Sequence, residues 1–231
     1  MKNETQETPK ITVTGDVILT RKPDIAYVSL YIRTDGILLE DAVRESSNKV
    51  RQVHQTLRET YQEIREIQIQ DVYIGGESRP AVGFARDSAN PTRPEVVKSL
   101  LVTLPANPEI AIKIVDTACR LGCMFGNPGA FPPGRTTQSA ILYGLADPGE
   151  AQQEAFARAI ADAKEKAWRM AKNVESKPGP IKQVSVLEFP NPEEILKRTQ
   201  SSLLARAKYL SISAEAVEVS AKVSVTFELE R

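Results

Sequence analysis

Strict alternation of apolar and polar residues near the C-terminal end is the feature that most limits how this chain can fold. Every second residue there is apolar, namely Val217, Val219, Ala221, Val223, Val225, Phe227 and Leu229. A period of two predicts a β-strand with one face on a core and the other in water. Residues 11–20 repeat the pattern, and a second strand is predicted at 25–32, after the break at Pro23-Asp24. Long strands of this kind are typical of an antiparallel sheet that is covered on one side.

Two other segments show helical periodicity. Residues 39–57 and 156–174 have stripes at steps of three and four, so each predicts an amphipathic helix. The expected stripes are Leu39, Val43, Ser46, Val50, Val53 and Leu57, and then Phe156, Ile160, Ala163, Ala167, Met170 and Val174. Asp147-Pro148, a cap residue followed by proline, predicts the start of the second helix. Alanine at every fourth position from 151 to 171 would let this helix lie close to a sheet or, alternatively, to a helix of another subunit.

The order of these segments predicts an α+β fold with a mostly antiparallel sheet of long strands covered by helices. Each of the two helices is flanked by strand-like segments, which suggests a strand–helix–strand unit used twice. A strand at 95–105 and a helix at 107–122 are expected between the two units. The Gly/Pro-rich segments 75–94 and 124–138 are expected to be irregular, and so is the insertion 190–213, with a partly helical structure of that insertion as an alternative. We expect a single domain at 9–231 after a polar tail at 1–8, with two lobes, 9–104 and 105–231, as an alternative.

The two cysteines, Cys119 and Cys123, fall at the end of the predicted helix 107–122. Gly122 is expected to end that helix in the left-handed conformation. A zinc site needs four ligands and a thioredoxin-like pair has two intervening residues, whereas this chain has three between its cysteines and a single histidine, His54. We therefore expect buried structural cysteines, a partly exposed structural histidine, no metal and no cofactor. P-loop, dinucleotide and nucleophile-elbow motifs are absent, so no catalytic residue is predicted and the chain is not expected to be an enzyme.

Charge and hydropathy limit the expected partners. Thirty basic and thirty acidic residues cancel, which disfavours nucleic acid as a partner. No stretch approaches ~18 consecutive apolar residues, so no membrane span is expected, although peripheral association with the cell envelope is left open. The polar N-terminal segment lacks the apolar region of a signal peptide, which predicts a cytoplasmic protein, or a periplasmic one if a leader has been removed.

Apolar residues in the Gly/Pro-rich loops, and a basic amphipathic segment at 193–210, are the candidates for an interaction surface. The candidate residues are Phe84, Phe125, Phe131, Leu203, Leu204 and Arg206. The alternatives are that the loop phenylalanines fold back onto the core and that 193–210 is an ordinary solvated surface segment.

Three motifs, in this order, resemble the SIMPL-domain family. They are the opening "ITVTGDVILTRKPDIAYVSLYIRTDG", the Ala-rich helix with its core from Ala159 to Ala167, and the closing strand at 217–229. Members of that family are mostly bacterial periplasmic or outer-membrane-associated proteins, with relatives among bacterial stress proteins and a mammalian adaptor of a Pelle-like kinase. The resemblance implies an α+β fold, a tendency to form ring- or channel-like homo-oligomers, and no established catalytic residues. The insertions at 75–94 and 124–138 depart from the family pattern.

These observations together predict a non-enzymatic, self-assembling binding or scaffold protein, linked to envelope or oxidative stress. Its expected partners are further copies of itself, as a homo-oligomer, or another protein. Two alternatives stay open at this stage. One is an enzyme that acts on a small molecule through a carboxylate and lysine site, and the other is a protein–protein signalling adaptor.

Overall fold

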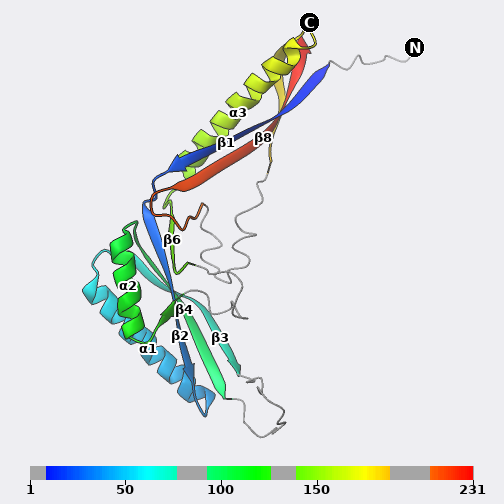
Figure 1. The fold of residues 1–231 in the computed structure, drawn as a ribbon. Helices are drawn as coiled ribbons and strands as arrows, with labels where there is room; N and C mark the ends of the chain where they lie inside the picture. Colours follow the sequence, from blue (N-terminus) through cyan, green and yellow to red (C-terminus); the bar gives the residue numbers. More distant parts are fainter. Residues whose placement is uncertain (1–8, 77–92, 126–138, 188–208, 231) are drawn as a thin grey trace, which may run out of the picture. The chain divides into compact units, whose positions relative to one another are not determined.

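The computed structural model describes residues 9–76, 93–125, 139–187 and 209–230, which form three helices and eight strands (Figure 1). In chain order these are β1 (Lys10–Arg21), β2 (Ile25–Asp35), α1 (Leu39–Thr60), β3 (Glu66–Gly76), β4 (Pro94–Pro105), α2 (Pro108–Arg120), β5 (Met124–Phe125), β6 (Ile141–Gly144), α3 (Gly149–Lys172), β7 (Lys177–Val186) and β8 (Val217–Glu230). The strands form two antiparallel sheets, so the predicted α+β class is confirmed.

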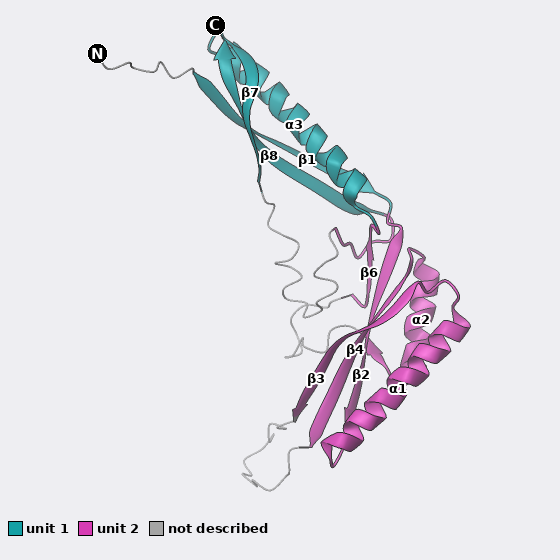
Figure 2. Cartoon of the chain, turned by 180° about the vertical axis from the view of Figure 1, so that it is seen from behind, with its two compact units in different colours: residues 1–22, 147–194, 216–231 teal, residues 23–146, 195–215 magenta. Residues whose placement is uncertain are grey.

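The chain divides into two compact units (Figure 2). Unit 1 consists of residues 1–22, 147–194 and 216–231, and unit 2 of residues 23–146 and 195–215. These boundaries differ from the expected lobes 9–104 and 105–231, because β1 at the start of the chain pairs with β8 at its end. The break predicted at Pro23-Asp24 coincides with the first crossing from unit 1 to unit 2.

Unit 1 is a three-stranded sheet in the order β1-β8-β7, covered on one face by α3. The register of β1 and β8 runs without interruption from Lys10 opposite Glu228 to Arg21 opposite Val217. The alternation predicted for β8 is observed, because every apolar residue from Val217 to Phe227 is buried. On the other face, hydroxyl side chains lie opposite one another, and the Oγ1 atoms of Thr12 and Thr226 are 2.9 Å apart.

The α3 helix packs on this sheet mainly with its alanines, two of which, Ala163 and Ala167, belong to the predicted stripe, while Phe156 and Ile160 of that stripe are half-buried. The buried residues are Ala151, Ala155, Ala159, Ala163, Ala167 and Ala171, whereas Met170 and Val174 are 50% and 60% exposed. The prediction was wrong for Met170, because Ala167 and Ala171 take the buried positions there, and for Val174, which lies beyond the end of the helix. The backbones of the helix and the sheet meet at Gly15. A Cβ atom on Gly15 would lie 1.9 Å from the Ala159 carbonyl oxygen, so only small side chains fit here. Of the two uses predicted for the alanine row, packing on a sheet is confirmed.

A four-residue repeat also explains how α3 follows the sheet. Because an α-helix has 3.6 residues per turn, each step of four moves the buried position by about 40° around the helix. The alanine row therefore winds around α3 and stays in contact with a β-ribbon that is itself twisted. Figure 1 shows α3 lying along β1 and β8 over most of their length.

Unit 2 is built on a five-stranded sheet in the order β3-β4-β2-β5, with β6 also paired to β2. Helices α1 and α2 lie on one face of this sheet (Figure 1). The core between the layers includes Leu30, Ile32, Leu57, Leu100, Leu104 and Ile114. The first predicted strand–helix–strand unit is present as β2, α1 and β3. The second occurs in chain order as β6, α3 and β7, but its two strands lie in different sheets, β6 in that of unit 2 and β7 in that of unit 1.

The helix ends largely follow their local signals. The Asn107 side chain accepts hydrogen bonds from the amides of Glu109 and Ile110 at the start of α2. Asp147 accepts from the Gly149 amide at 2.9 Å, so α3 begins one residue after the proline that was expected to be its first. In α1 the predicted stripe holds from Ser46 onward, but the first turn of the helix exposes its apolar residues and buries Ala42 instead.

Candidate interaction surface

Within the described ranges, no group of three or more His, Cys, Asp or Glu side chains is arranged to hold a metal ion. None of the helices in this part of the chain is long and apolar enough to cross a membrane. His54 lies on α1 with an exposed side chain, where partial exposure was expected.

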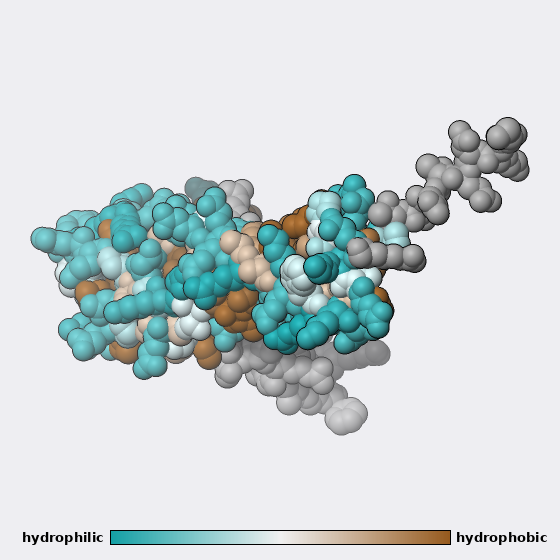
Figure 3. Space-filling model, turned by 90° about the horizontal axis from the view of Figure 1, so that it is seen from above, coloured by the Kyte–Doolittle hydropathy of each residue, from teal (hydrophilic) through white to brown (hydrophobic). Residues whose placement is uncertain are grey.

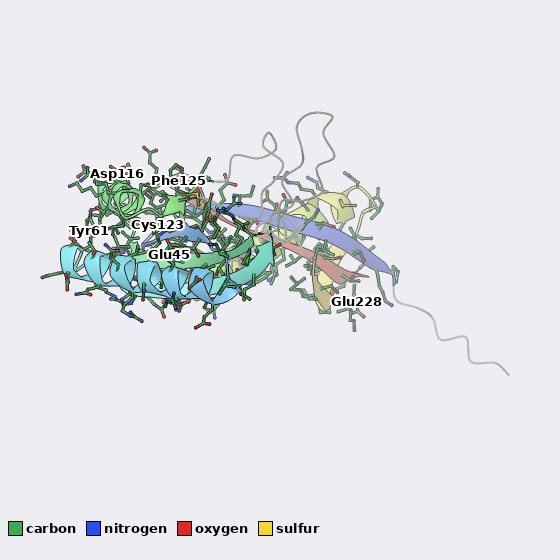
Figure 4. The ribbon with its side chains drawn as sticks, turned by 90° about the horizontal axis from the view of Figure 1, so that it is seen from below. Glu45, Tyr61, Asp116, Cys123, Phe125 and Glu228 are labelled. Carbon is green, nitrogen blue, oxygen red and sulfur yellow. The ribbon has the colours of Figure 1, made fainter. Side chains whose placement is uncertain are left out.

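The cysteine segment ends a helix, as predicted. Gly122 has a φ of +85°, and the amides of Gly122 and Cys123 donate at 2.9 Å to the carbonyls of Cys119 and Ala118. Cys123 is buried in the core of unit 2, but Cys119 is exposed, so the expectation that both cysteines are buried was wrong for Cys119. Cys119 is exposed because successive residues of an α-helix point in different directions around its axis. Ala118 occupies the buried face of α2, and the next residue therefore points toward solvent. In Figure 4, Cys123 lies on the side of α2 that faces α1, and Asp116 lies on the opposite side of the helix.

Thiol labelling is expected to separate the two cysteines. Burial raises the pKa of the Cys123 thiol to about 12, so about one such thiol in ten thousand would be ionised near pH 8. In the folded protein a disulfide reagent should therefore titrate close to one thiol per chain, and two after denaturation. Cys119→Ser should remove the fast reaction. Two thiols that react at similar rates in the folded protein would contradict this assignment.

One of the six predicted surface residues lies within the described residues. Phe125 is 58% exposed at the end of β5, opposite Leu30 of β2 (Figure 4). The other five residues, Phe84, Phe131, Leu203, Leu204 and Arg206, lie outside the described residues. The part of the insertion 190–213 that is described includes Ser211, which pairs with Tyr143.

A larger apolar surface lies on β3, where no interaction was predicted. Ile69, Val72 and Ile74 are 52%, 54% and 53% exposed, and we call these three residues the β3 shelf. Their cross-strand partners are Leu100, Lys98 and Val96 of β4. Leu100 packs in the core and the Lys98 ammonium donates to Ser47 of α1 at 2.9 Å, so the shelf is on the helix-covered side of the sheet. It stays exposed because α1 packs mainly on β2 and β4.

The start of α1 is a second exposed apolar segment of unit 2. Ile37 and Leu38 are 84% and 62% exposed just before the helix, and Leu39 and Val43 are 42% and 37% exposed in its first turns. Val43 is one turn before Ser47 on the same side of α1, which is the side that faces β4. On the face seen in Figure 3, hydrophobic residues (brown) reach the surface between hydrophilic ones.

The outer edge of β1 is covered by charged side chains of α3. The amide of Asp16 donates to Asp162 at 2.9 Å, and the Lys166 ammonium lies 2.8 Å and 2.6 Å from the carboxylates of Asp16 and Asp162. The hydrogen bond from Lys166 and that from the Asp16 amide lower the pKa of the Asp162 carboxyl. Farther along the strand, Arg21 forms an ion pair with Glu154.

The other outer strands differ in how their edges are protected. On β7, Pro178, Pro180 and Lys182 are residue types that discourage strand pairing. β3 contains neither proline nor lysine between residues 67 and 76, and its one charged residue there is Asp71. Among the outer strands described, β3 therefore combines the largest apolar exposure with the least protection against pairing.

The sequence shows the apolar alternation of the β3 shelf but not its exposure. Apolar residues alternate through Ile67 and Ile69 and resume at Val72 and Ile74, on either side of a bulge. Such alternation predicts that one face of the strand is buried. It does not show whether a helix reaches the outermost strand of the sheet and covers that face. The exposure of the shelf could therefore not have been read from the pattern alone.

The comparisons with known proteins agree with the sequence motifs. No curated protein matches the chain. A family model described as "SIMPL: Protein of unknown function (DUF541)" matches residues 11–227, nearly the whole chain, and this chain therefore belongs to the SIMPL family.

Proposed function

We propose that this protein is a self-assembling, non-enzymatic binding or scaffold component whose copies associate through unit 2. The observation that carries the proposal is the β3 shelf, whose three aliphatic side chains are each more than half exposed on an outer strand. Contiguous exposed apolar surface on a folded protein is typical of an interaction site. Burial in an interface would remove this surface from water, which is favourable by ~25 cal/mol per Å² of apolar area.

Sedimentation velocity and light scattering at micromolar concentration test the proposal. We expect a species whose mass is a multiple of the chain mass. Replacing Val72 and Ile74 together by lysine should shift the population to smaller species, because burying two ammonium groups in the interface is unfavourable. The matched control is Val184→Lys with Val186→Lys, since these residues have similar exposure on the outer strand of unit 1 and should leave the mass unchanged. A wild-type protein that stays monomeric would refute the proposal.

A role in envelope or oxidative stress is proposed from the family resemblance. If assembly serves that role, a strain that lacks the gene should grow poorly under peroxide or envelope stress. Wild-type protein should restore growth, and the Val72→Lys, Ile74→Lys variant should not. If both proteins restored growth equally, the role in stress would not depend on assembly through the β3 shelf.

A further inference from the structure

We propose that β3 of one copy pairs with β3 of a second copy, antiparallel and about a two-fold axis at Tyr73, so that two unit 2 sheets become one continuous sheet. This inference rests on the proposed function and deepens it by naming the partner strand and its register. It goes beyond apolar contact, because it assigns backbone hydrogen bonds and a defined pair of opposing residues.

Backbone alternation shows which amides of β3 face outward. The Gly36 amide donates to the Pro94 carbonyl and the Ala106 amide donates to the Asp24 carbonyl, so even-numbered residues of β4 bond toward β2. Odd-numbered residues of β4 must then bond toward β3, where Val97 is opposite Tyr73 and Glu95 is opposite Gly75. The Arg65 amide, which donates to the carbonyl of odd-numbered Thr103, agrees with this pattern.

It follows that Val72 and Ile74 direct their amides and carbonyls to the outer edge of β3. When β3 pairs with β3 of a second copy about an axis at Tyr73, the backbone groups of both residues can form hydrogen bonds to that copy. Val72 then lies opposite Ile74 of the second copy, and the two residues exchange N–H···O bonds as in any antiparallel ladder. Tyr73 lies opposite Tyr73 in a pair without hydrogen bonds, with Cα atoms about 4.5 Å apart.

The side chains suit this register on both faces of the sheet. Val72 and Ile74 of one copy lie beside Ile74 and Val72 of the other. The two shelves therefore join into one apolar strip on the helix side of the sheet. On the opposite face the Tyr73 ring lies over Gly75, where an added Cβ would be 2.5 Å from the phenol oxygen. Asp71 falls opposite Gly75 of the second copy, so the one charge between residues 67 and 76 does not meet its counterpart.

A second copy fits this edge better than an arbitrary extended peptide, because the strand is complementary to itself in shape and charge. Outer strands that must stay unpaired carry proline, lysine or a covering element, as β7 and β1 do in unit 1. β3 lacks proline and lysine there and presents three β-branched side chains instead. An isologous contact of this kind closes on itself and therefore produces a defined pair of chains.

Disulfide trapping tests the register directly. Two cysteines whose Cα atoms are 4.4–6.8 Å apart can form a disulfide, and the Tyr73 pair meets that condition. In a Cys119→Ser background, which removes the exposed native thiol, Tyr73→Cys should form a covalent dimer on mild oxidation. Ile18→Cys is the matched control, because Ile18 and Tyr73 are both 63% exposed and Ile18 lies in unit 1. We expect at least a tenfold larger dimer fraction for position 73.

Proline at position 74 provides a second, independent measurement. Ile74→Pro removes an amide that points outward and no bond to β4, and outer strands tolerate proline at such positions. We expect an unchanged circular dichroism spectrum and a loss of the assembly seen by sedimentation, whereas Ile74→Val should keep both.

The outcomes distinguish the two proposals. Monomeric wild-type protein would overturn both the proposed function and the pairing of β3. An assembly that forms no more cross-link at position 73 than at position 18, or that persists in Ile74→Pro, would overturn the strand pairing and leave self-assembly intact.

Discussion

Replacing Gly15 by valine is expected to unfold unit 1. A Cβ atom at this position would lie 1.9 Å from the Ala159 carbonyl oxygen and 2.8 Å from the Ala163 amide nitrogen, so the clash is with helix backbone. A rotamer change cannot relieve it, and α3 would have to move off the sheet along its alanine row. We expect a loss of more than about 4 kcal/mol in the free energy of unfolding, in the range that only severe core disruptions reach.

Amide hydrogen exchange is the measurement that checks this result, because it reports β1, α3 and β8 separately from unit 2. Protection in those three elements should collapse in Gly15→Val. Thr14→Val is the matched control, since it introduces the same side chain one residue away on the open face of β1, opposite Ser224. Thr14→Val should change stability by less than about 0.5 kcal/mol. Native protection in Gly15→Val would show that α3 is not held in contact with β1.

The second large effect is expected at Leu100→Ala in unit 2. Leu100 is 1% exposed at the centre of the sheet, with Leu30 and Ile69 opposite it on the neighbouring strands. Removing three carbon atoms leaves a cavity under α1 and should destabilise unit 2 by about 2–5 kcal/mol. The next residue along β4, Leu101, lies on the other face with Tyr27 and Leu142, so it cannot fill this cavity.

Urea denaturation with hydrogen exchange of β2 and β4 is the appropriate measurement for Leu100→Ala. Protection of these strands should fall while that of β1 and β8 is retained, because the two units have separate cores. Ser99→Ala provides the comparison, since Ser99 lies on the opposite face and is only half-buried. A destabilisation below about 1 kcal/mol at Leu100 would contradict the assignment of this residue to the core.

The helix ends show which features could be predicted from short segments. Asn107 caps α2 and Gly122 ends it with a positive φ, as their residue types and spacing indicate. These outcomes depend on hydrogen bonds within one turn of helix, so the neighbouring residues are sufficient. The buried face of α3 is harder to predict from a short segment. The periodic pattern favours burial of Met170 and Val174 because their side chains are large and apolar, yet both are exposed. The alanines take the buried positions instead, in a row that meets Gly15, more than a hundred residues away in the chain.

The candidate surface shows the same division. The composition of its loop predicts that Phe125 lies at the surface, and it is exposed. The more extensive apolar surface, however, is on β3, in a segment whose sequence is typical of a buried strand. Whether Val72 and Ile74 are covered depends on where α1 crosses the sheet. The position of α1 depends in turn on the core residues of β2 and β4, not on β3 itself.

The amino-acid sequence by itself determined the helices, the long strands, the two ends of α2 and the α+β class, because each of these depends on periodicity and hydrogen bonding over a few residues. Only the tertiary structure decided that the two ends of the chain share one sheet, that the alanines of α3 meet Gly15, and that β3 lies at an edge with its apolar side uncovered. The physical reason is that burial is a property of what packs on a residue, and for these positions the packing partners come from distant parts of the chain.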